Sequence, residues 1–196
     1  MCHDLLSGWF RRMLLAMMQD NLSHLHWVSG EAARGHLPRE ICALLLREDS
    51  FTQFWRGITD GEIDFIVLFS GVASVMSDEV AALGQASGSA HWLRTAQWSL
   101  AGEVWVHART VLGVVSSLPS CFTTSSRPMG DVIFQPGDCT IDETQLAALP
   151  VSSCGVFEVP PSMSSSEVIW VRRRRMRYLD LPFLLTEFFC RGAYAC

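Results

Sequence analysis

The sequence lacks most of the short motifs that identify a particular chemistry. It has no glycine-rich phosphate loop, no Gly-x-Ser-x-Gly nucleophile elbow, no His-Glu-x-x-His pair, and no cysteines and histidines at zinc spacing. Its seven cysteines include no Cys-x-x-Cys pair, and those in loop-like sequence, Cys121, Cys139 and Cys154, have no evident histidine partner. We therefore expect no bound metal, no cysteine nucleophile, and reduced thiols rather than disulfides.

Long apolar runs and an excess of basic charge are also missing. The longest apolar run, residues 63–76, contains Asp64 and is shorter than the ~20 residues of a membrane-spanning helix. The first four residues include an acid and lack the basic segment of a signal peptide. The net charge of −5 disfavours bulk binding to nucleic acid. These absences predict a cytoplasmic protein with no nucleic-acid partner and no stable membrane insertion.

The composition is that of a globular protein. Hydrophobic residues make up 49% of the 196 residues and charged residues 18%, which suits one domain with a real core. Residues 1–20 carry apolar side chains at helical spacing, so we expect a helical extension over residues 1–21 before a domain over 22–196. The expected role of this helix is core packing, and binding to a membrane surface is the alternative.

The stretch 170–189 is typical of two strands joined by a turn. The first strand is expected over residues 168–179, where the side chains suit a pleated surface. Asp180 and Pro182 then break the run, and the second strand is expected over 183–189. This second strand is apolar on both faces, which is typical of a strand in the middle of a covered sheet.

Glu187 does not fit this apolar strand. Alternation places it on the same face as Phe183, Leu185 and Phe189. An ionised carboxylate there loses hydration worth several kcal/mol, so it needs a donor, a cation or a proton. Glu187 is therefore a candidate site residue, and a structural salt bridge with an arginine across the hairpin is the alternative. The basic run 172–175 itself is typical of solvated strand edges or pocket rims.

A second hairpin is expected from residues 91–100 and 104–111. Arg94 and Arg109 each share a face with mainly apolar neighbours on their strands. Guanidinium groups in such places are typical of pocket cations that bind carboxylates. The alternative is that one of them pairs with Glu187 inside the core, and for Arg109 the residues alone favour this alternative.

Two helices are well marked. Pro38 suits the first turn of one, and Ser50 with Gln53 forms a capping box that begins another running toward Trp55 or Ile58. We further expect a strand over 63–69, a helix over 78–83 and a helix over 142–149, with loops in the rest of 118–134 and 135–167. These elements predict a small α+β domain with an enclosed pocket for a small anionic molecule.

Three blocks of sequence, residues 44–52, 92–111 and 170–189, together resemble the chorismate–pyruvate lyase family. The second block contains Trp-Leu-Arg ending at Arg94 and Arg-Thr-Val beginning at Arg109, and the third contains Trp-x-Arg-Arg and a Pro-x-Leu-Leu-x-Glu pattern. Their order and internal spacing carry the resemblance, which covers residues 22–191. It implies a single antiparallel β-sheet with helices packed on it and flap segments over an internal ligand pocket.

The resemblance also implies a function and its residues. The reaction would convert chorismate to 4-hydroxybenzoate and pyruvate, the first step of ubiquinone biosynthesis, in a monomer that needs no metal or organic cofactor. Arg94 matches the arginine that binds the ring carboxylate, and Glu187 matches the glutamate that meets the ring hydroxyl; these are the implied catalytic residues. Phe51 stands near that hydroxyl, and Met129 stands where the backbone contacts the carboxylate. Arg109 matches a second pocket arginine, an anchor for the enolpyruvyl carboxylate.

The chain departs from the family pattern at Asp131, where an arginine is common, so the charge near the pocket mouth is open. A non-catalytic module that binds small aromatic acids, like the effector domains of some bacterial transcription regulators, is the alternative function. Against it, residues 1–40 are too short for the helix-turn-helix domain that normally precedes such modules. A lipid-interacting protein that uses its N-terminal helix is a third reading.

Overall fold

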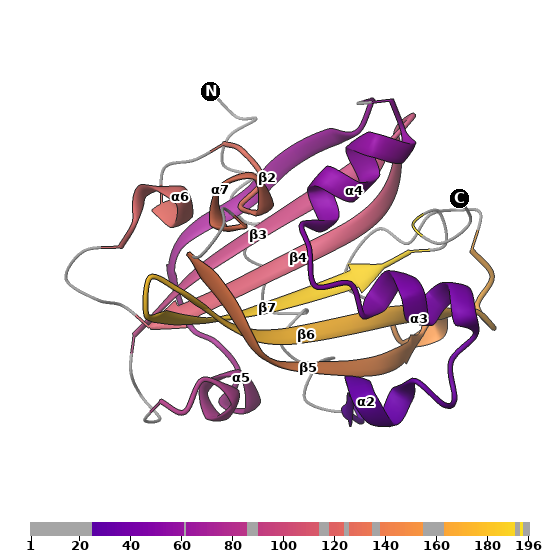
Figure 1. The fold of residues 1–196 in the computed structure, drawn as a ribbon, viewed down its shortest axis with the longest axis horizontal. Coiled ribbons are helices and arrows are strands. Elements are labelled where there is room, and N and C mark those ends of the chain that lie inside the picture. Colours follow the sequence, from indigo (N-terminus) through magenta and orange to yellow (C-terminus); the bar gives the residue numbers. More distant parts are fainter. Residues whose placement is uncertain are drawn as a thin grey trace, which may run out of the picture.

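A single seven-stranded sheet organises the fold (Figure 1). The computed structural model describes residues 25–60, 62–85, 90–113, 118–123, 126–134, 138–154, 163–190 and 193. All neighbouring strands are antiparallel, in the order β1-β5-β6-β7-β4-β3-β2. The strands are β1 Val28–Ser29, β2 Asp64–Ala73, β3 His91–Leu100, β4 Glu103–Gly113, β5 Cys139–Pro150, β6 Val168–Tyr178 and β7 Leu181–Phe189. With the helices that pack on this sheet, the architecture confirms the predicted α+β fold.

Short helices cover the sheet. Figure 1 shows two of them, α3 and α4, lying across the same face. The described helices are α2 Gly30–Ala33, α3 Arg39–Leu45, α4 Phe51–Ile58, α5 Ser77–Ala82, α6 Ser120–Thr123 and α7 Gly130–Ile133, with a 3-10 turn at Val151–Ser153. Ser50 is the N-cap of α4, and its hydroxyl accepts a hydrogen bond from the backbone N–H of Gln53 at 3.3 Å, which confirms the predicted start of this helix.

Two tight hairpins build the middle of the sheet. Strands β6 and β7 are joined at Leu179 and Asp180, and both of these residues have positive φ. Strands β3 and β4 are joined in the same way at Ala101 and Gly102. Two-residue turns with positive φ at both positions match the twist of antiparallel strands, so they fix the register of each pair. Both predicted hairpins are confirmed, although Pro182, which was expected in the turn, lies in β7 opposite Arg177.

Strand β7 is buried on both faces, as its apolar side chains predicted. Phe183 and Leu185 belong to one buried cluster, Leu184 belongs to a second and Phe188 to a third. Because side chains alternate along a strand, the sheet must be covered on both sides at this strand. The strand lies between β6 and β4, in the interior of the sheet.

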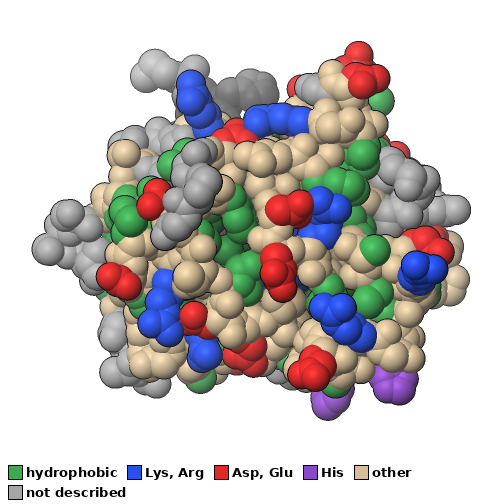
Figure 2. Space-filling view, in the orientation of Figure 1, with side chains coloured by type: hydrophobic (Ala, Val, Ile, Leu, Met, Phe, Trp, Pro, Cys, Tyr) green, Lys and Arg blue, Asp and Glu red, His purple; other side chains and the backbone are tan. Residues whose placement is uncertain are grey.

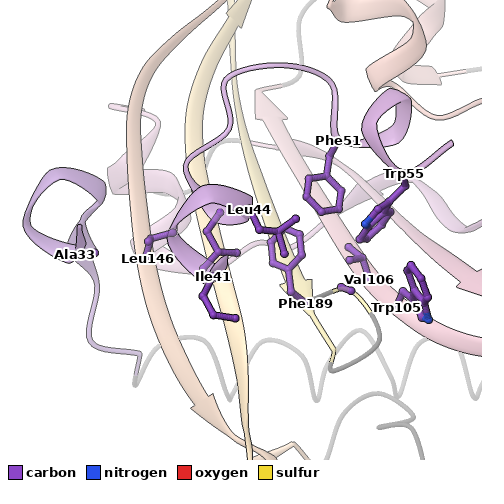
Figure 3. Packing of buried hydrophobic residues seen from close by; sticks show 11 residues of the cluster. Ala33, Ile41, Leu44, Phe51, Trp55, Trp105, Val106, Leu146 and Phe189 are labelled. Atoms are coloured by element: carbon purple, nitrogen blue, oxygen red, sulfur yellow. The ribbon is translucent and has the colours of Figure 1, made fainter. Parts of the chain in front are cut away.

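An aromatic cluster holds α4 against the sheet (Figure 3). The ring of Phe51 lies 4.0 Å from that of Trp55 and 4.9 Å from that of Phe189, measured between centroids, and both pairs meet edge to face. Trp55 also contacts Trp105 with 5.8 Å between ring centroids. Such pairs contribute roughly 0.5–1.5 kcal/mol each beyond the burial of their surface. They fix the first turn of α4 above strands β7 and β4.

Some expected elements are wrong or too short. The helix expected over 142–149 is instead part of β5, which pairs with β6 along its whole length. Pairing with a neighbouring strand overrides a weak local helix pattern, because it satisfies the backbone groups and buries one face. The strand expected over 63–69 extends to Ala73 as β2, and the stretch expected as a loop over 118–134 contains α6 and α7.

The helix expected over residues 1–20 lies outside the described residues. Within the described part of the chain, none of the helices has the length and apolar character needed to cross a membrane.

Candidate functional site

The pocket floor consists of residues on four neighbouring strands that face the same side of the sheet. Strand pairing aligns Arg94, Thr110, Leu185 and Arg174 as one row across β3, β4, β7 and β6. The next row along the same strands is Ala96, Ala108, Glu187 and Arg172. All of these except Arg172 line one pocket. The two alanines leave space in the centre of the floor, with charged groups on both sides of it.

Two helices and one aromatic side chain form the cover of this pocket. The lining residues that they contribute are Phe51, Thr52 and Trp55 from α4, Met129, Gly130 and Ile133 at α7, and Phe134. Residues of α4 contact residues of α7 directly. The pocket lining is therefore largely apolar, and its charged members are Arg94, Arg174 and Glu187. Charges in such a place act on a ligand with little screening by water.

Glu187 is held by two arginines from β6. Its Oε2 accepts a hydrogen bond from Arg172 Nε at 2.7 Å and lies 3.5 Å from Arg174 Nη2. Burial alone would raise the pKa of Glu187, but the charges of Arg172 and Arg174 and the hydrogen bond from Arg172 together hold its pKa below the ordinary value. Glu187 is thus ionised at neutral pH. It forms the salt bridge across the hairpin that the alternative interpretation expected, and it also lines the pocket, so it remains a candidate site residue.

Arg94 is buried at the other side of the pocket. Its side chain is 3% exposed, and its Nη2 donates a hydrogen bond to the carbonyl oxygen of Arg127 at 2.8 Å. Its guanidinium carbon lies 5.6 Å from the ring centroid of Phe65. The contact with Arg127 ties β3 to the segment that leads into α7. Arg94, Glu187, Phe51 and Met129 are thus brought together in one pocket.

Arg109 is not brought to this pocket. Along β4 the residues that line the pocket are Val106, Ala108 and Thr110, so Arg109 faces the other side of the sheet. There its Nε and Nη2 donate to the two carboxylate oxygens of Glu79, at 2.6 and 2.9 Å, and both side chains are buried. The expectation that Arg109 pairs with Glu187 is therefore wrong. Its expected place as a pocket anchor is corrected to that of an ion pair between the sheet and α5.

The sequence interpretation expected an arginine across the hairpin to pair with Glu187, but it did not identify Arg172 and Arg174 as the two that do. Both are essentially unexposed, whereas the run 172–175 was expected at a strand edge or pocket rim. Their neighbours Arg173 and Arg175 face the opposite side, where Arg173 bonds Asp78 and Gln145. The alternation of the run was the available signal. Alternation shows which arginines share a face of the strand, but it does not show which of the two faces forms the pocket.

Asp131, the departure from the family pattern, forms an ion pair across the cover. Its Oδ1 accepts a hydrogen bond from Arg56 Nη1 of α4 at 2.7 Å, and both side chains are partly exposed. The acid at this position is thus balanced by an arginine from the facing helix. On the face of the molecule seen in Figure 2, acidic and basic side chains are interspersed in the same way.

A family model described as chorismate lyase matches residues 21–194 of the chain. A probable chorismate pyruvate-lyase 2 of Pseudomonas entomophila (strain L48) is 27% identical over 149 residues, which cover 74% of this chain and 77% of the relative. A probable chorismate pyruvate-lyase of Shewanella loihica (strain ATCC BAA-1088 / PV-4) is 25% identical over 181 residues, covering 86% of this chain and 93% of the relative.

Solved structures share the fold at lower identity. The PhnF C-terminal domain superposes with a TM-score of 0.53 and 15% identity, covering 68% of this chain and 87% of that domain. The C-terminal domain of the histidine utilization repressor from Pseudomonas syringae pv. tomato str. DC3000 gives a TM-score of 0.50 and 10% identity. The match covers 68% of this chain and 95% of that domain. At such identities the likeness shows the fold alone.

Proposed function

Because the chain belongs to the chorismate lyase family, we propose that its pocket converts chorismate to 4-hydroxybenzoate and pyruvate. The observation that carries the proposal is the placement of Arg94 and Glu187 on one face of the sheet, two strands apart and in one buried pocket. A guanidinium group on one side and a carboxylate on the other suit a ring with a carboxylate and, opposite it, a hydroxyl group.

The proposed reaction is an elimination that makes the ring aromatic. The bond between ring carbon C3 and the ether oxygen breaks, and its electron pair leaves with the enolpyruvyl oxygen. The hydrogen on C4 leaves as a proton, and the electrons of that C–H bond form the new ring double bond. The methylene carbon of the leaving enolpyruvate takes up a proton, which gives pyruvate. Because aromatisation drives the reaction, the task of the protein is to orient the substrate, an effect that reaches ~7–11 kcal/mol of barrier in favourable cases.

Each pocket residue has a role that follows from its charge and position. Arg94 binds the ring carboxylate through charge-assisted hydrogen bonds, typically worth ~1.5–3 kcal/mol. Glu187 accepts a hydrogen bond from the 4-hydroxyl group, which its lowered pKa supports because the carboxylate stays ionised. Phe51 lies over the hydroxyl side, and the backbone at Met129 contacts the carboxylate side. The cover formed by α4 and α7 excludes water from the reacting bonds.

The direct test is to mix the purified protein with chorismate and follow the absorbance of 4-hydroxybenzoate. We expect turnover by the natural protein and a loss of at least a hundredfold in the variant Arg94→Ala, with an unchanged circular dichroism spectrum. The matched control is Arg177→Ala on β6, because that arginine is more than half exposed and pairs with Asp142 outside the pocket. Tight binding of 4-hydroxybenzoate without any turnover of chorismate would favour the non-catalytic binding module instead.

We further propose that the enzyme acts in the cytoplasm as a monomer and supplies the ring of ubiquinone. 4-Hydroxybenzoate is the aromatic precursor that this pathway consumes. Expression of the chain in a bacterial strain that lacks its own chorismate–pyruvate lyase should restore growth without added 4-hydroxybenzoate. Growth that still depends on the added acid would contradict this placement.

A further inference from the structure

Arg174 is a buried cation that the other groups of the pocket leave incompletely bonded. Its side chain is 1% exposed, and it lines the pocket beside Glu187. Its Nη2 lies 3.5 Å from Glu187 Oε2, and its Nη1 lies 3.5 Å from the carbonyl oxygen of Arg47, both at the long limit for a hydrogen bond. Its buried Nε has no hydrogen-bond partner among the described residues.

The neighbouring Arg172 has a different environment. Its Nε bonds Glu187 at 2.7 Å and its Nη1 bonds the carbonyl oxygen of Leu45 at 3.0 Å. Arg172 does not line the pocket, so it serves to hold the carboxylate of Glu187 in place. Arg172 Nη2 also has no hydrogen-bond partner among the described residues, but Arg172 is not part of the pocket lining. Arg174 is thus the β6 arginine that both lines the pocket and has a donor left for a ligand.

The charges around the pocket do not balance without a ligand. Among the described residues, Arg172 and Arg174 share the single carboxylate of Glu187, which leaves one positive charge in excess beside the pocket. Asp49, whose charge also acts on Arg174, is already paired with Arg47. Burial and the nearby Arg172 lower the pKa of Arg174 to about 10, so its side chain stays charged at neutral pH. A buried excess of this kind is costly unless an anion compensates it.

The position of Arg174 relative to Arg94 defines where the second negative charge would lie. The two arginines stand at opposite ends of one row, three strands apart, which is roughly 14 Å between their Cα atoms at the usual strand spacing. Glu187 lies between them in the next row, close to Arg174. In chorismate the enolpyruvyl ether is attached to the carbon next to the one that bears the hydroxyl group. A substrate held by Arg94 and Glu187, with its ether on the β6 side of the ring, therefore directs its second carboxylate toward Arg174.

Resting on the proposed function, we infer that Arg174 binds the enolpyruvyl carboxylate and makes the pocket selective for a dianion over the monoanionic aromatic product. This assigns to Arg174 the anchoring role that the sequence had suggested for Arg109. Loss of one charge-assisted contact corresponds to a weakening of about tenfold to hundredfold, confined to ligands that carry the second carboxylate.

The test compares two unreactive ligands by calorimetry. One is 4-hydroxybenzoate, and the other is 3-(carboxymethoxy)-4-hydroxybenzoate, which adds a second carboxylate through an ether at the position of the enolpyruvyl group. The variant Arg174→Met keeps the length of the side chain and leaves Glu187 bonded to Arg172, so it should fold. We expect it to bind the dianion at least tenfold more weakly and 4-hydroxybenzoate within threefold of the natural protein. The variant Arg94→Met should weaken both ligands.

Arg175→Met is the matched control, because that side chain is 41% exposed and lies on the opposite face of β6. It should bind both ligands as the natural protein does. Equal losses of both ligands in Arg174→Met, or no loss of either, would overturn the inference. A natural protein that prefers the dianion yet shows no turnover of chorismate would contradict the lyase proposal while leaving the dianion site intact. The two failures are therefore distinguishable.

Discussion

Glu187 combines a structural and a chemical task in one side chain. Its carboxylate neutralises part of the charge of Arg172 and Arg174, and the same carboxylate faces the pocket. The two tasks are linked, because the arginines that keep Glu187 ionised also fix its orientation. A carboxylate held in this way is a weak base but a strong, well-placed hydrogen-bond acceptor.

The variant Glu187→Gln separates these tasks. The amide keeps the shape of the side chain, so binding of 4-hydroxybenzoate should persist, whereas turnover of chorismate should fall by at least a hundredfold. Leaving two buried guanidinium groups without their carboxylate should lower the free energy of unfolding by about 3–5 kcal/mol. Steady-state kinetics, calorimetry and urea unfolding measure the three effects. The control is Glu143→Gln, a partly exposed glutamate on β5; full activity of Glu187→Gln would show that its role is structural only.

At this scale, the sequence could predict a residue that breaks an apolar pattern. Glu187 and Arg94 stand out because each is charged on a strand face that is otherwise apolar. Arg172 and Arg174 do not stand out, because a run of four arginines hides its own alternation. Arg109 broke the pattern as clearly as Arg94 did. Only the pairing of strands and helices showed that its partner is Glu79, which lies on α5.

At the scale of elements, the pocket depends on how closely α7 approaches the start of α4. A Cβ atom at Gly130 would lie 2.8 Å from Ser50 Oγ and 3.2 Å from Thr52 Oγ1, so only glycine fits this contact without a shift. Ser50 cannot move freely, because its hydroxyl caps α4. The ion pair between Arg56 and Asp131 joins the same two helices at their exposed side.

The variant Gly130→Ala should therefore displace α7 from α4 and open the cover. Inserted volume in a packed contact costs roughly 1–3 kcal/mol, and we expect it to appear as a several-fold rise in KM with a smaller change in kcat. Steady-state kinetics with chorismate measures both. The matched control is Gly57→Ala in α4, where an added Cβ meets nothing within 4 Å and should leave KM unchanged. An unchanged KM in Gly130→Ala would mean that the contact has no part in closing the pocket.

Elements with their own local signals were predicted, whereas β5, α6 and α7 were not. The N-cap at Ser50 and the turn residues after β6 are local, so they specify α4 and the hairpin by themselves. Strand β5 has a mixed sequence that suits a short helix about as well. It becomes a strand because β6 offers a free edge along its whole length.

On the scale of the whole molecule, the two faces of the sheet bury charged side chains in different ways. The pocket face holds Arg94, Arg174 and Glu187, with charge left for a ligand. The opposite face holds the pair of Arg109 and Glu79, which is bidentate and fully buried. Breaking such a pair would leave a buried charge without its partner, so the pair fixes the position of α5 on the sheet and takes no part in the pocket. Which face becomes the pocket depends on where the helices pack, and this is a property of the folded molecule that alternation along one strand does not specify.

His107 lies on β4 on the face opposite the pocket and should make the stability of the whole molecule depend on pH. Burial lowers the pKa of His107 to about 4 from an ordinary 6.5, so the folded protein keeps the ring neutral where the unfolded chain binds a proton. The free energy of unfolding should therefore fall by about 3 kcal/mol from pH 6.5 to pH 4 and flatten below that range. Urea unfolding across this range should show a smaller slope in His107→Gln, whereas His36→Gln, at an exposed histidine, should keep the natural slope. Equal slopes in the natural protein and His107→Gln would show that His107 is protonated in the folded state.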